Sequence, residues 1–233
     1  MFKARTIKSR TGNSVNNTRA GRRGSGRGPG GGSLGGLMLA GPVITVLCVA
    51  SLPAVAGPRG ERVVRGEASF NRQGRNTTIT AGDRAIIEYD SFNIGRRQSV
   101  EFVQPGAGAR VMNRITGGDP TAIRGSLKSN GIIYIVNPAG VIFGPNSVIN
   151  VGGMYAAAAT ISDQDFVQGN DHFTNVQGRV VNHGSITGDS AVALIGRRVA
   201  NFGSVVADTG TVTMVAGDEV WICLLYTSPS PRD

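Results

Sequence analysis

A short phrase recurs along the chain at nearly constant spacing. Gly-Ser followed by an aliphatic residue occurs at 125–127, 184–186 and 203–205, and four or five residues later each copy leads into an apolar run. Asn182 and Asn201 begin the two closest copies, at a spacing of 19 (201 − 182). A period of roughly 20 residues with one short β-rich run per copy is typical of a solenoid built from strands.

The apolar runs at 132–136, 191–195 and 211–215 align residue by residue. Three columns result: Ile133, Val192 and Val212; Ile135, Leu194 and Met214; Val136, Ile195 and Val215. The interval from Ile133 to Val192 is 59 (192 − 133), which we interpret as three periods. The predicted fold class is all-β, a right-handed parallel β-helix with an N-terminal cap, with about eight coils in a rod of about 40 Å. A β-sandwich is the alternative, but it does not require a repeated phrase.

The stretch from 124 to 153 sets the size of a coil. It contains three apolar runs, Ile132–Val136, Val141–Phe143 and Val148–Val151, each bounded by Gly, Pro or Asn. Such runs read as short strands. The residues Asn137–Gly140 suit a type I turn, because Asn favours the first corner, Pro the second and Gly the fourth.

The remaining residues between the leader and the C-terminal segment show the same alternation of short strands and turns, except in two less regular parts. Further strands are predicted over Ala68–Thr80, Ala85–Tyr89, Ser91–Gly95, Val100–Val103 and Val111–Ile115, with a turn at 81–83. The residues Met154–Ile161 fit either a buried strand or a helical turn. The polar segment Ser162–Thr174 is expected to leave the rod as an excursion.

All of the net charge comes from the segment 1–60. It holds nine of the 24 Lys and Arg and none of the 15 acids, so the remainder is neutral and a nucleic-acid partner has no support. A basic segment, an apolar stretch at 34–50 and Ala54-Val55-Ala56 predict a signal peptide over 1–56, cleaved after Ala56. The stretch is broken by Pro42, which argues against a permanent membrane anchor.

Alternatives for this leader remain open. Arg22-Arg23 lacks the apolar continuation of a twin-arginine signal, and the basic part could include misassigned upstream codons. At the other end, Cys223–Asp233 breaks the repeat and resembles translated adapter sequence, so the secreted body is taken as 57–222. Cys48 would be removed with the leader, which leaves no disulfide. We expect the natural protein to continue with further coils.

No catalytic or metal-binding constellation stands out. Of the two histidines, His183 lies at a repeat corner and neither belongs to a nucleophile motif, and no cofactor is predicted. The acidic group Asp163, Asp165 and Asp171 lacks the tight spacing of a calcium loop. Because some β-helices cleave polysaccharides, Asp119, Arg124 and Lys128 define a runner-up hypothesis of a polysaccharide-active enzyme. Gly28–Gly32 does not join a strand to a helix, so no phosphate loop is predicted.

Eight motifs in order carry a family resemblance. They are Ser91–Gly95, Val100–Pro105, Asn113–Gly117, Ile123–Leu127, Asn130-Gly131, Val136–Gly140, Phe143-Gly144 and Ile149–Gly153. Together they resemble the two-partner secretion domain at the N-terminus of filamentous haemagglutinin-like exoproteins. The chain departs from the family pattern at Ala139, where Asn is usual, and at 88–90, where a Trp is common.

The resemblance implies the function. The domain would be a secretion module recognised by an outer-membrane β-barrel transporter with periplasmic domains, and it would nucleate β-helix folding. The exoprotein would be secreted or held at the surface of a Gram-negative-type cell and would most simply be an adhesin acting on host or neighbouring cells. A stalk carrying a contact-dependent toxin is an alternative. The residues implied in recognition or nucleation are Asn113, Arg114, Asn137, Pro138, Ala139 and Gly140.

Overall fold

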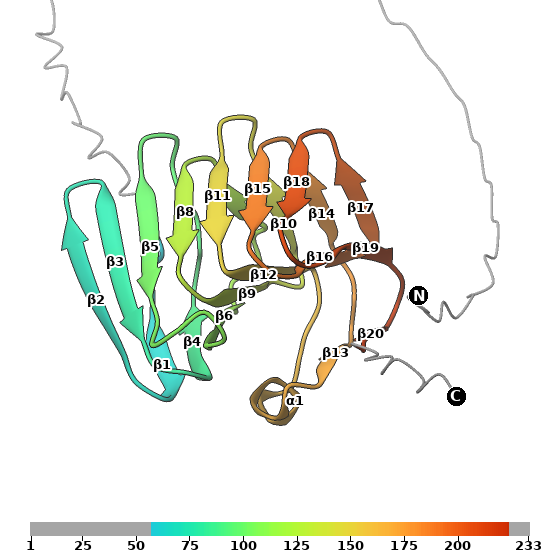
Figure 1. Ribbon diagram of the computed structural model, residues 1–233, viewed down its shortest axis with the longest axis horizontal. Coiled ribbons are helices and arrows are strands. Elements are labelled where there is room, and N and C mark those ends of the chain that lie inside the picture. The colour runs from blue at the N-terminus through green and yellow to red at the C-terminus, as the bar shows by residue number, and fades with distance from the viewer. Residues whose placement is uncertain (1–56, 224–233) are drawn as a thin grey trace, which may run out of the picture. The chain divides into compact units, whose positions relative to one another are not determined.

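The computed structural model describes residues 57–223, which form one row of stacked coils (Figure 1). The middle coils visit three sheets in turn. The signal peptide predicted over 1–56 lies outside the described residues, and so does all but Cys223 of the segment 223–233. Within 57–223, no helix has the length and apolar character needed to cross a bilayer.

Sheet 1 has seven strands and runs the length of the row. In spatial order they are β1 (Arg62–Arg65), β4 (Ala85–Tyr89), β6 (Arg110–Ile115), β9 (Ile132–Val136), β12 (Gly153–Ala157), β16 (Val192–Gly196) and β19 (Val212–Ala216). All neighbours are parallel except β1 and β4. Six parallel strands therefore give about six coils.

Sheets 2 and 3 complete each coil. Sheet 2 contains β7 (Thr121–Ile123), β10 (Gly140–Phe143), β14 (Arg179–Asn182) and β17 (Arg198–Asn201). Sheet 3 contains β2 (Ala68–Gln73), β3 (Asn76–Ala81), β5 (Ser99–Val103), β8 (Ser126–Ser129), β11 (Val148–Val151), β15 (Ser185–Gly188) and β18 (Ser204–Ala207). The predicted parallel β-helix is confirmed.

The residues that were aligned in columns from the sequence are paired in neighbouring strands of the structure. Val192 pairs with Val212, Leu194 with Met214 and Ile195 with Val215. Alternate residues of each strand point into one continuous apolar core, since side chains on a strand alternate between faces. Stacked Ile, Val and Leu fill this core, so each coil is stabilised mainly by its two neighbours.

The number of coils was overestimated. Ile133 and Val192 are separated by two steps rather than three, because Met154 lies between them and pairs with both. The steps are 21 and 38 residues long (154 − 133 and 192 − 154). The longer one contains the excursion, which holds α1 (Asp163–Gln168) and β13 (Asp171–Phe173). The excursion adds a length close to one period, and the interval from Ile133 to Val192 was therefore counted as three coils instead of two.

The middle of sheet 1 is buried on both faces, most completely at β12 and β16. Its outer face packs against the excursion through a second apolar cluster that includes Tyr134, Tyr155, Phe166 and Phe173. This double burial explains why β12 is apolar throughout. It also resolves the segment Met154–Ile161, whose first part forms strand β12 rather than a helical turn.

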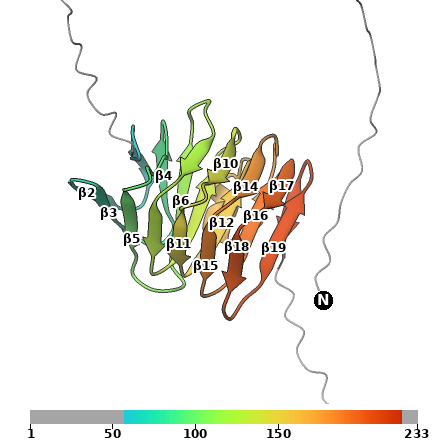
Figure 2. The same cartoon turned by 90° about the horizontal axis from the view of Figure 1, so that it is seen from above.

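The N-terminal end is capped by antiparallel strands (Figure 2). The segment Ala68–Thr80, predicted as strand, is a hairpin of β2 and β3 that turns at Gly74, where φ is +60°. Ala68 and Phe70 pack against the core from this hairpin. The strand predicted at Ser91–Gly95 is wrong, because only isolated bridges form there, at Ser91 and Ile94. The cap covers the end of the core that an unpaired coil would expose.

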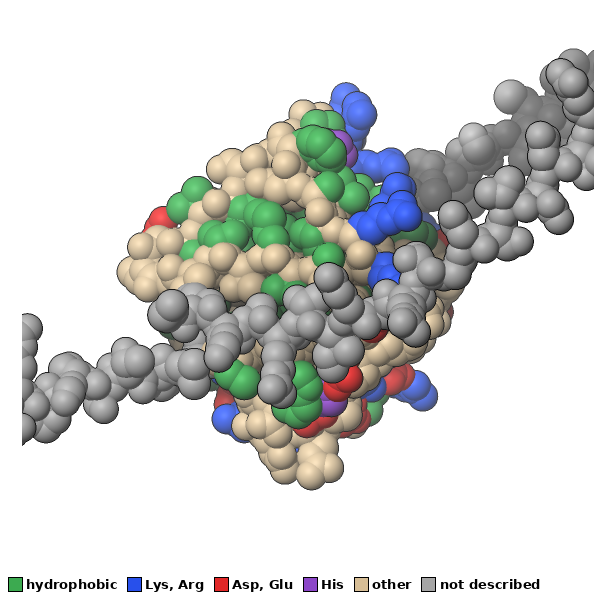
Figure 3. Space-filling view, turned by 90° about the vertical axis from the view of Figure 1, so that its right-hand side faces the viewer, with side chains coloured by type: hydrophobic (Ala, Val, Ile, Leu, Met, Phe, Trp, Pro, Cys, Tyr) green, Lys and Arg blue, Asp and Glu red, His purple; other side chains and the backbone are tan. Residues whose placement is uncertain are grey.

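The other end of the core is more open. Val212 and Met214 are 37% and 43% exposed, whereas Val192 and Leu194, their partners one coil earlier, are fully buried. Figure 3 shows hydrophobic side chains on the surface at this end. The last short strand, β20 (Val220–Ile222), leaves the coil and pairs with β13 of the excursion.

Candidate functional site

The turn at Asn137–Gly140 forms as predicted. The Gly140 amide donates to the Asn137 carbonyl at 2.9 Å, and the Ala139 amide donates to the Asn137 side-chain oxygen at 3.0 Å. Gly140 has φ of +125°, and a Cβ there would lie 2.8 Å from the Arg179 carbonyl oxygen. Glycine is therefore required at this corner by both conformation and space.

Asn137 also ties its turn to the preceding coil. Its Nδ2 donates to the Asp119 carbonyl and to Thr121 Oγ1, both at 3.0 Å. The side chain is fully buried and all of its polar atoms are hydrogen-bonded. In the folded state this asparagine shapes the corner, and no partner can reach it.

Asn113 is a polar residue in the core. It occupies the same column as Ile87 and Ile135 and is fully buried. Its Nδ2 donates to the Tyr134 carbonyl at 3.1 Å, while its Oδ1 finds no donor within residues 57–223. A buried acceptor without a donor reduces stability, so this residue is not explained by packing alone.

Arg114 points to the opposite face of the same strand. Its guanidinium donates to Glu88 Oε1 at 3.3 Å and to the Ile161 carbonyl at 3.2 Å, and it forms an ion pair with Asp163. Arg62, and with it Arg114, holds the pKa of Glu88 below its ordinary value. Arg114 thus links β6 to its neighbouring strand and to the start of the excursion.

A surface groove of about 500 Å³ lies at the corner between sheet 1 and sheet 2. Arg114, Pro138 and Ala139 line it, together with the apolar side chains of Val136 and Ala159. Three of the six predicted residues therefore meet at one accessible surface. The other three, Asn113, Asn137 and Gly140, are buried.

The excursion is attached to sheet 1 by a buried polar network that the sequence did not reveal. Tyr134 donates its hydroxyl to Asp171 Oδ1 at 2.7 Å, and Arg110 donates to the Tyr134 hydroxyl at 3.2 Å. The rings of Tyr134 and Tyr155 stack at 4.3 Å. Burial raises the pKa of Asp171, and it also raises the pKa of both tyrosines, so their hydroxyls remain protonated donors.

The acidic group of the excursion is dispersed rather than convergent. Asp163 pairs with Arg114, Asp165 accepts from Ser162 at the start of α1, and Asp171 contacts Tyr134. In the part of the chain that the structure describes, no set of His, Cys, Asp and Glu is arranged to hold a metal ion.

The two histidines have different surroundings. His172 stacks on Trp221 at 3.7 Å, and its Nε2 lies 2.6 Å from Glu219 Oε1, which joins the excursion to β20. His183 stacks on Phe202 at a corner of sheet 2, with ring centroids 5.0 Å apart.

The residues of the enzyme hypothesis come from different parts of a coil. Asp119 is exposed in the turn before β7, and Arg124 is exposed directly after that strand. Lys128 is on the outer face of sheet 3, in register with Glu101. Their backbone positions place them along the coil rather than around one reaction centre.

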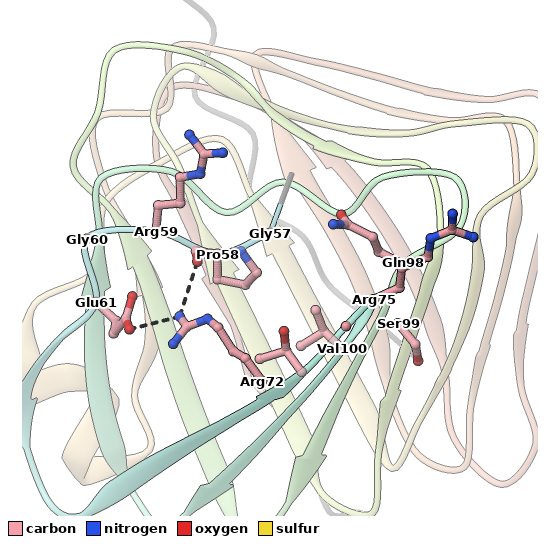
Figure 4. Close-up of a pocket in the computed structure, with 12 residues that line it drawn as sticks. Gly57, Pro58, Arg59, Gly60, Glu61, Arg72, Arg75, Gln98, Ser99 and Val100 are labelled. Atoms are coloured by element: carbon pink, nitrogen blue, oxygen red, sulfur yellow. Dashed lines mark hydrogen bonds and ion pairs between the residues drawn. The ribbon is translucent and has the colours of Figure 1, made fainter. Parts of the chain in front are cut away.

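A second cavity, of about 440 Å³, lies at the capped end (Figure 4). Arg72 spans it and contacts Glu61 at 2.8 Å and the Pro58 carbonyl at 3.3 Å. These contacts fix the first described residues onto the cap. The predicted signal residues Ala54 and Ala56 precede them and lie outside the described residues.

These features agree with the comparison with known families. The sequence model of the family described as "TPS secretion domain" matches residues 54–224 of this chain. This chain belongs to the TPS secretion domain family. The match spans the entire β-helix, its cap and the excursion, so the predicted resemblance is confirmed. TPS secretion domain proteins are exported through the outer membrane and are secreted or displayed at the cell surface.

Individual relatives support the same assignment. A heme/hemopexin-binding protein of Haemophilus influenzae is 36% identical over 155 residues, which is 62% of this chain and 17% of that protein. A second protein of that description from this species is 38% identical over 101 residues, 42% of this chain and 11% of the relative. The chain thus spans less than a fifth of either relative.

A solved structure shows the same fold. The HMW1 secretion domain from Haemophilus influenzae is 33% identical, with a TM-score of 0.69, and the match covers 71% of this chain and 46% of that one. This TPS secretion domain therefore has the parallel β-helix architecture of a structurally characterised family member.

Proposed function

We propose that a dedicated outer-membrane β-barrel transporter recognises this domain through its periplasmic domains, before the coils close. The observation that carries the proposal is the burial of Asn113 and Asn137, whose side chains a partner can contact only in the extended chain. Arg114, Pro138 and Ala139 stay accessible at the groove and could be contacted in either state.

Folding by coils suits this order of events. Each coil contacts mainly its neighbours, so structure can propagate as residues emerge from a pore. Folding outside the cell then hides the recognised asparagines, which favours release and opposes return. Cys223 is the single cysteine among the described residues and is free, so no disulfide within them obstructs threading.

The first experiment measures secretion of the full chain in a Gram-negative host with and without a cognate barrel. We expect the chain in the medium only when the barrel is present. Secretion without the barrel would contradict the transporter's role, and retention in the periplasm in both cases would contradict export by this route.

Asn113→Leu separates recognition from folding. Leucine matches its neighbours Ile87 and Ile135 and removes an unpartnered acceptor, so the variant should fold at least as stably as the parent. If the transporter reads the asparagine, secretion should nevertheless fall about tenfold, the effect of losing a contact of about 1.4 kcal/mol. Met112→Leu, on the opposite face of the same strand, is the control. Unchanged secretion of the Asn113 variant would remove it from the recognition motif.

We propose that the complete exoprotein is an adhesin whose target-binding regions lie beyond this domain. The relatives described as heme/hemopexin-binding proteins support a second candidate, haem acquisition at the cell surface. Binding of the complete exoprotein to cultured host cells and to haemin-agarose distinguishes the two. Cell binding alone supports the adhesin, and haemin binding alone supports acquisition.

We further propose that the domain has no polysaccharide-cleaving activity. Asp119, Arg124 and Lys128 lie at separate points of the coil, whereas acid–base catalysis needs groups within reach of one bond. Incubation of the secreted chain with polysaccharides should release no reducing ends. Release that Asp119→Asn abolishes would contradict this.

A further inference from the structure

The outer face of sheet 2 carries matched side-chain pairs on two adjacent strands. Arg179 of β14 is in register with Arg198 of β17, and Val181 is in register with Ala200. The intervening Val180 is fully buried in the core, so these pairs point outward. The two strands therefore present one continuous strip to solvent.

The arginine pair has no compensating charge. Adjacent strands lie about 4.8 Å apart, and like charges placed directly opposite on them are destabilising. The strands of sheet 2 contain no Asp or Glu. Within residues 57–223, neither Arg179 nor Arg198 forms an ion pair, although Arg197 beside them pairs with Asp218. A bound oxyanion would remove this repulsion.

An aromatic pair follows on the same strip. His183 and Phe202 come directly after β14 and β17, and their rings stack with an interplanar angle of 13°. Phe202 is 73% exposed. Each aromatic residue follows the arginine of its strand by four positions, a distance of about 13 Å. Figure 3 shows Lys and Arg side chains close to a histidine and to hydrophobic side chains at the end of the row that faces the viewer.

The other two sheets lack this combination. The outer face of sheet 1 is covered by the excursion over its middle strands. The outer face of sheet 3 carries Ser, Thr and exposed Val residues but, among its described residues, no exposed aromatic ring, and its Lys128 lies in register with Glu101, which has the opposite charge. Sheet 2 is thus the exposed face, among those described, on which unpaired cations and an exposed aromatic ring occur together.

We propose that this strip, defined by Arg179, Arg198, His183 and Phe202, binds an anionic polysaccharide. Guanidinium groups bind carboxylate and sulfate in bidentate fashion, and the apolar C–H face of a sugar ring packs on an aromatic ring. A polysaccharide lying along the strands would meet the arginine pair and the aromatic pair at once. The recognition groups are side chains on the sheet face rather than the edge of a strand, which distinguishes this ligand from a peptide that adds a strand.

The test uses the secreted full chain, with heparin as the probe and neutral dextran as the reference. We expect binding to heparin that weakens with salt, and none to dextran. Arg198→Gln and Phe202→Ala should each weaken heparin binding about tenfold, the effect of losing one contact of about 1.4 kcal/mol. Both residues are exposed, so the unfolding midpoints should stay close to that of the parent.

Arg97→Gln is the matched control, because Arg97 is exposed in the first coil, far from β17 along the row. Heparin binding that falls equally in this variant would reduce the effect to overall charge. Full affinity in Phe202→Ala would show ion exchange without sugar recognition. Equal binding of polyglutamate would instead assign the strip to an acidic peptide. Each of these results would overturn the proposal.

Discussion

Two buried asparagines in this TPS secretion domain have opposite hydrogen-bond environments. Asn137 uses every polar atom of its side chain, whereas the Oδ1 of Asn113 has no donor within the described residues. Asn137 is therefore explained by the shape of the corner. Asn113 reduces the stability of the folded coil, so stability does not explain why asparagine occupies this position.

Asn137→Ala should strongly destabilise the domain. The substitution removes the oxygen that accepts from the Ala139 amide and the amide group that donates to Asp119 and Thr121 of the previous coil. Each polar group left without a partner costs about 1–3 kcal/mol. We expect the free energy of unfolding to fall by about 2–4 kcal/mol, measured by urea denaturation. Asn150→Ala, at an exposed position of β11, should leave it unchanged. A loss equal in both variants would contradict the assigned role of Asn137.

Glu88→Gln should change the acid sensitivity of the domain. The pKa of Glu88 lies below its ordinary value of 4.5, chiefly because of Arg62. A carboxylate with a lowered pKa contributes stability above its unfolded pKa, and this contribution is lost as the pH falls through the folded pKa. The parent should therefore be more stable than the variant at neutral pH, and the difference should shrink in acid. Urea midpoints of both proteins measured across this range test it, and a constant difference would argue against the ion pairs.

At the scale of elements, strand β13 makes polar contacts from both of its faces. Asp171 faces inward to Tyr134 and Arg110 on sheet 1, while the next residue, His172, contacts Glu219 and stacks on Trp221. Because side chains alternate on a strand, three residues are enough to reach both surfaces. The excursion thereby joins the middle coils to β20, which follows the last coil.

Asp171→Ala and Asp171→Asn should differ. Alanine leaves the buried Tyr134 hydroxyl without its acceptor, which costs about 1–3 kcal/mol. Asparagine keeps an acceptor oxygen and removes a carboxylate whose burial raises its pKa, so its effect should be smaller. Hydrogen exchange should become faster over α1 and β13 in the alanine variant. Exchange over α1 and β13 that stays at the parent's rate in the alanine variant would show that the network does not hold the excursion.

The sequence was sufficient for the repeating parts and insufficient for the insertions. The columns through Ile133 and Val192 could be predicted because stacking coils demand the same residue type at the same position. The coil count failed because the excursion adds length close to one period. The hairpin at Gly74 was missed because β2 and β3 read as one polar strand. The contacts of Asp171 and the burial of Asn113 depend on neighbours at least one coil away along the chain, and no local pattern encodes them.

At the largest scale, the two ends of the coil stack formed by residues 57–223 differ. The first coil is covered by the β2–β3 hairpin, with Phe70 against the core, while the last coil leaves Met214 43% exposed. In a solenoid the stability of each coil depends on its own contacts and on its two neighbours. A coil with one neighbour and a partly exposed core should therefore open first.

We predict that the chain as given, in which β19 belongs to the last described coil, frays from β19 toward β6. Native-state hydrogen exchange should show the strongest protection in β6, β9 and β12, and the weakest in β17, β18 and β19, because local opening follows local burial. Leu194→Ala should cost about 2–5 kcal/mol and speed exchange in both of the last coils, whereas Met214→Ala should cost much less, since its side chain is already partly in water. Uniform protection along sheet 1, or equal losses for the two substitutions, would mean that the stack opens as one cooperative unit. In that case, folding during export could not proceed coil by coil, and the domain would have to emerge completely before any of it became stable.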